Sequence, residues 1–249
     1  MATTQTSTAR RLRDRSRDAD RWARPAAVSA GIVAVTSIGI MALAGEVIPP
    51  LVVIAVAFGL GAAAIVRTEA RWLRYGLATV GVLAIVGNLP FVVADLTHPE
   101  SFAGFAPQVV LTVAVLFTAF AAVASARSLA VPVRPIGASV LALAAVAVVA
   151  SASDAVAMAD DEAQPGDVAV VAEDLEFPAE VRVEAGAVGF FVDNADPFRH
   201  TFLIEGTDVD QELPGSTARR VTADLEPGTY RYYCDVPGHE DMEGTLVVE

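Results

Sequence analysis

The chain has no lysine, one cysteine and three histidines among its 249 residues. The single Cys234 excludes an intramolecular disulfide and every metal site that needs several cysteines, such as an iron–sulfur cluster. The formal charge of −13 argues against a nucleic-acid partner, because binding to phosphates needs clustered positive charge. Any chemistry must therefore be built from few residues.

Charge is distributed unevenly along the chain. Residues 1–158 carry 12 Arg and 8 acidic side chains, a net charge of +4, whereas residues 159–249 carry 5 Arg and 22 acidic side chains, a net charge of −17. The first part also holds the long apolar runs. This division predicts two regions of different class instead of one globular fold. Dense carboxylates without lysine further suggest adaptation to a salty environment.

Five apolar runs without a charged residue fill the first part. Each has about 17–22 residues, close to the ~20 that a helix needs to cross a membrane. The runs are 26–44, 48–66, 75–93, 105–126 and 136–152. We therefore predict a multi-pass α-helical membrane region with five transmembrane helices over residues 26–152, preceded by an Arg-rich segment, residues 1–25.

The placement of arginine predicts the orientation of these helices. All twelve Arg of the first part lie before the first run, in the second connection or in the fourth, and none lies in the first or third. Because cytoplasmic loops are rich in Arg, we expect the N-terminus in the cytoplasm and the C-terminal region outside it. Residues 42–44 resemble a signal-cleavage site, and cleavage there would leave four helices in the same orientation.

The predicted helices offer little chemistry of their own. They contain no His, so they cannot hold a haem through paired histidines, and no acid or base for an ion pathway. Asn88 and Pro90 are the conspicuous polar and kinking residues, and we interpret them as features of helix packing. His98 is interpreted as a solvated residue of an outer loop. The region is predicted to be an anchor or docking module.

The pattern changes after a polar, acidic linker at residues 153–166. Short alternating runs follow, separated by Pro, Gly, Asn and Asp turn signals. These strand-sized runs are 168–177, 180–185, 188–194, 200–206, 218–223, 228–234 and 244–249. Seven such runs predict an all-β sandwich over residues 167–249.

Three candidate metal ligands lie in one short segment, where Cys234, His239 and Met242 have the spacing C-x4-H-x2-M. A fourth candidate, His200, opens an earlier run. One thiolate, two imidazoles and a weak thioether form the ligand set of type 1 copper. Such a set suits both Cu(I) and Cu(II), so little rearrangement accompanies electron transfer. The sequence thus predicts one copper ion.

Residues 167–249 resemble the blue copper proteins, or cupredoxins, such as plastocyanin, azurin and the halocyanins. The resemblance rests on the early His, the strand GTYRYYC, the PGH turn and the closing GTLVV strand. It implies a Greek-key sandwich in which His200, Cys234 and His239 are equatorial copper ligands and Met242 is the axial one. It also implies that electrons pass through the exposed edge of His239.

Two positions depart from the commonest family pattern. The spacing from His239 to Met242 is short for the family but matches amicyanin-like loops. The alternative to an axial-ligand role for Met242 is that its side chain fills the core. Thr201 stands where the family commonly has the Asn that braces the Cys loop, and we expect its hydroxyl to substitute in that role.

The resemblance implies an electron carrier and not an enzyme. Its redox partners would be respiratory complexes or a terminal oxidase at the extracytoplasmic face of the cell membrane. The alternative is a copper capture or delivery protein without redox cycling, although the Met-rich or His-rich tracts of copper scavengers are absent from the sequence. A multicopper oxidase or nitrite reductase needs further His-based centres, which two His in this region cannot supply alone.

Overall fold

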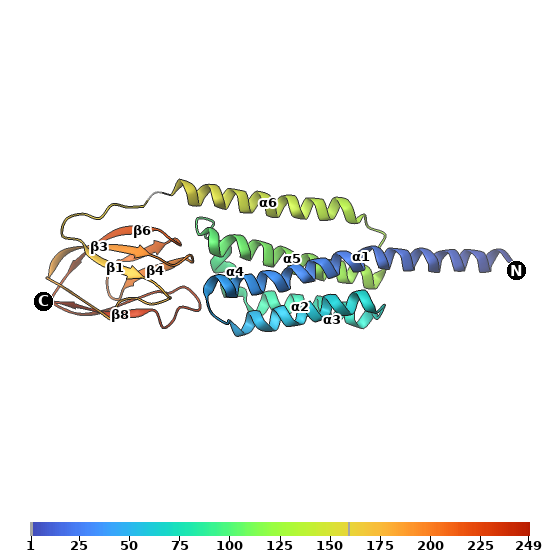
Figure 1. Cartoon of the computed structure of the whole chain (residues 1–249), viewed down its shortest axis with the longest axis horizontal. Coiled ribbons are helices and arrows are strands. Elements are labelled where there is room, and N and C mark those ends of the chain that lie inside the picture. The colour runs from blue at the N-terminus through green and yellow to red at the C-terminus, as the bar shows by residue number, and fades with distance from the viewer. Residues whose placement is uncertain (1, 159) are drawn as a thin grey trace. The chain divides into compact units, whose positions relative to one another are not determined.

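The computed structural model describes residues 2–158 and 160–249, with side chains described from residue 21 onward. Six helices precede eight strands in this part of the chain (Figure 1). The chain divides into two compact units. One comprises the helices up to Val92 together with residues 107–147, and the other comprises residues 93–106 and 148–249.

Four of the described helices are long and apolar enough to cross a membrane: α2, α5, α6 and the part of α1 from Arg21. Each coincides with one of the predicted spans. The helices have the bounds α1 (Ala2–Ala44), α2 (Pro49–Arg67), α3 (Arg71–Gly87), α4 (Leu89–Leu96), α5 (Phe102–Arg127) and α6 (Val133–Ala157). Two of them extend well beyond the predicted runs, because α1 also includes residues 2–25 and α6 continues into the predicted linker as far as Ala157.

The third predicted span, residues 75–93, is broken at Asn88. Helices α3 and α4 lie on either side of it and are bent by 68° relative to each other, so the prediction of one continuous helix is wrong. Pro90 has no N–H to donate, and its ring collides with the carbonyl one turn earlier, so a straight helix cannot pass through it. The Asn88 Nδ2 donates to the Ala84 carbonyl at 2.8 Å and helps to end α3. The two helices together would make a fifth span.

Trp22 is the largest fully buried side chain of the helical unit. Its ring packs edge-on against Phe120 at a centroid distance of 5.2 Å, and lies 6.2 Å from Phe117. The Ser29 hydroxyl donates to the Ala114 carbonyl at 2.8 Å and also joins α1 to α5. An aromatic contact and a buried hydrogen bond therefore hold α1 against α5.

The described strands form two sheets, with the orders β1-β3-β6 and β2-β8-β7-β4-β5. Their bounds are β1 (Val168–Ala172), β2 (Glu180–Val183), β3 (Gly186–Asn194), β4 (His200–Ile204), β5 (Asp210–Leu213), β6 (Ala218–Leu225), β7 (Gly228–Tyr233) and β8 (Glu243–Val248). The sequence predicts all of these except β5. That strand has the sequence DQEL, without a β-branched or aromatic residue, and forms through its pairing with β4 at the edge of the sheet.

The strands share one apolar core. The alternation expected of a strand is clear in β3, where Val188, Phe190 and Val192 are buried. An aromatic group with centroid separations of 5.6–5.8 Å fills the core and consists of Phe177, Phe190, Phe202 and Tyr232. Cys234 and Met242 belong to the same buried cluster. The core thus extends to the predicted metal ligands.

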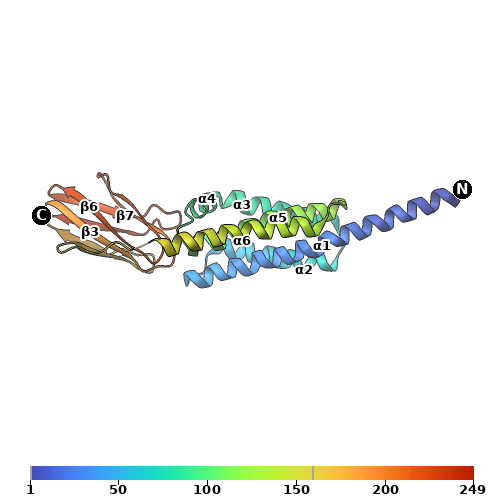
Figure 2. The same ribbon diagram turned by 90° about the horizontal axis from the view of Figure 1, so that it is seen from above.

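Strand β6 pairs with β3 and lies at the edge of the three-stranded sheet (Figure 2). Its outer side is covered by two acidic residues of the predicted linker. Asp160 Oδ1 accepts the Ala218 N–H at 3.0 Å, and Asp161 Oδ2 accepts the Arg220 N–H at 2.8 Å. The Asp161 N–H donates in turn to the Ala218 carbonyl at 3.1 Å. This stretch of the linker is therefore bound along β6.

Candidate metal centre

His200 is the first residue of β4, and its side chain is fully buried. Its backbone pairs with Leu213 of β5, and β4 is also joined to β7 through Leu203 and Ile204. The ring Nδ1 lies 3.1 Å from His239 Nδ1, and the ring Nε2 lies 2.9 Å from Asp196 Oδ2. Because Nε2 faces a carboxylate, it carries the ring proton, and the Nδ1 lone pair points at His239.

The loop between β7 and β8 carries the other three predicted ligands. Its base is closed by a hydrogen bond from the Cys234 N–H to the Met242 carbonyl at 3.0 Å. Within the loop, the His239 N–H closes a tight turn around Pro237 and Gly238. The φ of 92° at Gly238 suits the third position of a type II turn, where glycine is favoured, and Pro suits the second. The PGH motif therefore places His239.

The structure brings three of the four predicted ligands together. One ligand atom each from His200, Cys234 and His239 lies within 4.8 Å of the others. Cys234 Sγ is 3.7 Å from His239 Nδ1. Three ligands in a trigonal arrangement at about 2.0–2.3 Å from a metal ion are about 3.5–4 Å apart, so the cluster has the size of a metal site. The third histidine, His98, is not part of this cluster, and its Nδ1 lies 2.8 Å from Glu100 Oε1.

Comparison with known proteins agrees with this geometry. Residues 139–248 match the family model of the cupredoxin-like domain. The chain carries a cupredoxin domain. The match begins inside α6 and ends in β8. A single copper ion fits the domain's cluster of one thiol and two imidazole nitrogens.

Several solved structures are similar to this domain. Auracyanin B is 22% identical over 36% of this chain and 94% of its own, with a TM-score of 0.31. A Cu(I) form of an amicyanin variant is 24% identical over 37% of this chain and 90% of its own, with a TM-score of 0.31. A copper-containing nitrite reductase from Thermus scotoductus SA-01 is 21% identical over 38% of this chain and 26% of its own, with a TM-score of 0.29. No curated protein matches the chain.

Met242, the fourth predicted ligand, lies at the base of the cupredoxin loop with only 1% of its surface exposed. Its N–H donates to the His239 carbonyl at 2.9 Å, and its carbonyl accepts the Cys234 N–H. Its backbone is therefore held between two of the clustered residues. Its role as the axial ligand stays a prediction, with core filling as the alternative.

Burial controls the protonation of the three clustered residues. It lowers the pKa of His239 to about 4, and the neighbouring His200 adds to this effect. It also lowers the pKa of His200, although Asp196 opposes the shift. Both rings are therefore neutral at pH 7. Burial raises the pKa of the Cys234 thiol, so a cation that binds the thiolate must displace a proton.

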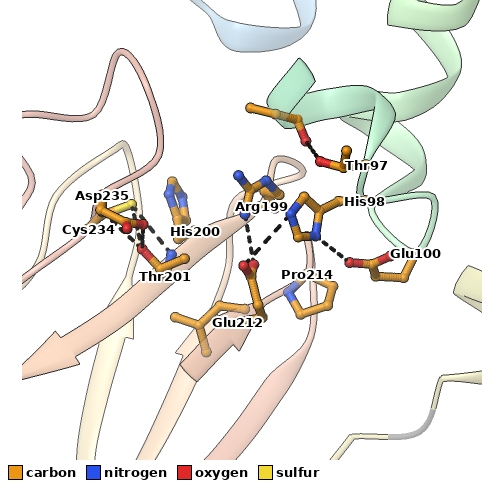
Figure 3. Close-up of polar contacts among 12 residues, drawn as sticks. Thr97, His98, Glu100, Arg199, His200, Thr201, Glu212, Pro214, Cys234 and Asp235 are labelled. Atoms are coloured by element: carbon orange, nitrogen blue, oxygen red, sulfur yellow. Dashed lines mark hydrogen bonds and ion pairs between the residues drawn. The ribbon is translucent and has the colours of Figure 1, made fainter. Parts of the chain in front are cut away.

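Thr201 connects β4 to the Cys loop (Figure 3). Its backbone N–H donates to Cys234 Sγ at 3.4 Å. Its hydroxyl donates to Asp235 Oδ1 at 2.8 Å and accepts the Asp235 N–H at 2.9 Å. The hydroxyl thus braces the Cys loop, in agreement with the role expected for the residue that replaces the usual Asn.

Asp196 lies next to the cluster. The sequence pattern places it only in the turn at residues 194–197 and does not indicate a role at the metal site. Burial opposes its ionisation, but the Leu175 N–H, the His200 ring and the Asp174 N–H together hold its pKa below the usual value. An Asp four residues before the first ligand His is a signal that could have pointed to it. The carboxylate is ionised at neutral pH and lies against a candidate copper ligand.

Proposed function

We propose that the protein is a membrane-anchored type 1 copper protein that carries single electrons. The main support for the proposal is that one thiol and two imidazole nitrogens lie close together in the cupredoxin domain. His200, Cys234 and His239 would hold the ion, and Met242 would be the weak axial ligand. Copper bound there supplies one-electron chemistry by alternating between Cu(I) and Cu(II).

The surroundings of the cluster suit repeated electron transfer. His200 and Cys234 are buried, which keeps water away from two of the three donor atoms. The loop base and the Thr201 hydroxyl hold the ligand positions through hydrogen bonds to strand and loop. Ligands held in one geometry for both oxidation states reduce the rearrangement that each electron transfer requires.

His239 is the partly exposed member of the cluster, so we propose that electrons enter and leave through its edge. The three residues before it, Val236, Pro237 and Gly238, carry no charge. Pro237 and Gly238 reach the surface beside the ligand, whereas the exposed Glu240 follows it and accepts the Gly238 N–H at 3.0 Å.

The helices provide the proposed membrane anchor. Four of those described can span a membrane, and the bent pair α3 and α4 would supply a fifth span. The distribution of Arg supports a cytoplasmic N-terminus and a cupredoxin domain on the outer face. A respiratory complex or a terminal oxidase at that face would then be the electron partner.

Copper titration of the full-length protein in detergent tests this function. We expect Cu(II) to produce an intense thiolate-to-copper absorption band with reversible one-electron voltammetry. The band should be lost in Cys234→Ser and retained in His98→Gln, which removes a histidine outside the cluster. Absence of the band from the unaltered protein would contradict the proposal. Bound copper that passes to an acceptor without reversible redox chemistry would favour delivery.

A further inference from the structure

The Asp196 carboxylate contacts the His200 ring on the side away from the other candidate ligands. Asp196 Oδ2 is 2.9 Å from His200 Nε2, whereas Nδ1 of the same ring is 3.1 Å from His239 Nδ1. A neutral imidazole has one N–H, and the carboxylate fixes it at Nε2. The Nδ1 lone pair is therefore directed toward the cluster.

Two consecutive backbone N–H groups hold this carboxylate. The Asp174 N–H donates to Oδ1 at 2.9 Å, and the Leu175 N–H donates to Oδ2 at 3.0 Å. Both residues have left-handed backbones, with φ of 56° and 61°. Successive N–H groups in such a conformation can point at one anion. The turn after β1 thus binds the Asp196 carboxylate through two backbone N–H groups.

The backbone of Asp196 is fixed as well. Its N–H donates to Asn194 Oδ1 at 3.0 Å, and its carbonyl accepts the Ser216 N–H at 2.8 Å. Asn194 is fully buried, and its Nδ2 donates to the Leu213 carbonyl at 3.0 Å. The carboxylate is therefore held in place by protein groups on several sides, independently of any bound ion.

We propose that Asp196 is a positioning residue that orients His200 and lowers the reduction potential of the copper site. Reduction adds one electron and lowers the charge of the ion by one. A fixed negative charge close to a ligand stabilises the more positive Cu(II) more than Cu(I), and a carboxylate acceptor makes the imidazole a stronger donor. Both effects oppose reduction. This inference rests on the proposed function, since it requires a redox-active copper ion.

The test compares Asp196→Asn with the unaltered full-length protein after copper loading. We expect Cu(II) affinity to fall about 10–100-fold, as is typical when a carboxylate behind a metal-bound His is lost, with a smaller loss of Cu(I) affinity. For each factor of ten by which the loss of Cu(II) affinity exceeds the loss of Cu(I) affinity, the one-electron potential rises by about 59 mV. Asp196→Glu keeps the charge and should restore much of the original potential. Asp193→Asn is the matched control, because it removes an exposed carboxylate from the same segment.

A second measurement needs no variant. In the Cu(I)-loaded protein, the His200 Nε2–H proton should exchange slowly with solvent in NMR spectra, because it is buried and bonded to Asp196. Rapid exchange would overturn the proposal. An unchanged potential in Asp196→Asn, or an equal shift in Asp193→Asn, would overturn it as well. If the unaltered protein is blue and redox-active, these results refute only the role of Asp196; if it is not, the proposed function fails first.

Discussion

Thr201 and Asp235 hold each other through two hydrogen bonds, one in each direction. The Thr201 hydroxyl donates to Asp235 Oδ1 at 2.8 Å and accepts the Asp235 N–H at 2.9 Å. His200 immediately precedes Thr201, and Cys234 immediately precedes Asp235. The pair therefore fixes the separation between two candidate ligands that are distant in the sequence.

Replacement of Thr201 by Val keeps the shape of the side chain but removes the hydroxyl. We expect the free energy of unfolding to fall by about 1–3 kcal/mol, because the Asp235 N–H loses its partner. We also expect a broader thiolate-to-copper band, because the ligand separation is less fixed. Thermal melts and absorption spectra measure the two effects. Thr201→Ser keeps the hydroxyl and should resemble the unaltered protein; a Val variant with unchanged stability and spectrum would contradict the bracing role.

Met242→Leu distinguishes an axial ligand from a core filler. Leu has a similar volume and should cost less than about 1.5 kcal/mol of stability at this buried position. If the thioether is a weak ligand to copper, its removal destabilises Cu(II) and raises the reduction potential. Voltammetry of the copper-loaded variant checks this. An unchanged potential and spectrum would assign Met242 to the core alone.

Gly244 lets β8 approach the Tyr232 side chain closely. The Tyr232 hydroxyl donates to the Pro178 carbonyl, and a Cβ on residue 244 would collide with both of these groups. We expect Gly244→Ala to destabilise the cupredoxin domain by about 1–3 kcal/mol, as over-packing usually does. Gly228→Ala is the control, because a Cβ there would meet only ordinary contacts. Equal melting temperatures for the two variants would contradict this prediction.

We expect Tyr232 to make the stability of the domain sensitive to alkali. Burial raises the pKa of its hydroxyl from 10.0 to about 12. The unfolded chain therefore loses this proton at lower pH than the folded protein. The contribution of the protonated Tyr232 to the free energy of unfolding is complete below about pH 10 and is lost as the pH rises toward 12. Unfolding measured across this range should show a smaller decline in Tyr232→Phe. An identical decline in both proteins would assign the effect to other groups.

Local patterns in the sequence predict the ligand loop and the apolar strands of the cupredoxin domain. The C-x4-H-x2-M spacing and the PGH turn place Cys234 and His239 in one loop, and the structure brings the predicted ligand His200 to the same cluster. Strand alternation likewise predicts β3 and the other apolar strands. In each case the signal lies within a few residues and follows a backbone period or a ligand spacing.

Two features that the sequence does not predict depend on long-range contacts. The polar strand β5 forms through its pairing with β4, and Asp196 lies against His200 because the turn at Asp174 and Leu175 binds its carboxylate. The break at Asn88 has a local cause in the nearby proline. Even so, composition alone does not show whether such a residue kinks a membrane helix or divides it.

The binding of Asp160 and Asp161 along β6 has a consequence for contacts between molecules. An edge strand with free N–H and carbonyl groups can add a strand from another chain, which is a common route to aggregation. Here the N–H groups of Ala218 and Arg220 are already bonded to carboxylates of the same chain. A neighbouring molecule would have to displace negatively charged side chains before it could pair at this edge. Two copies of the protein would thereby be hindered from pairing through β6.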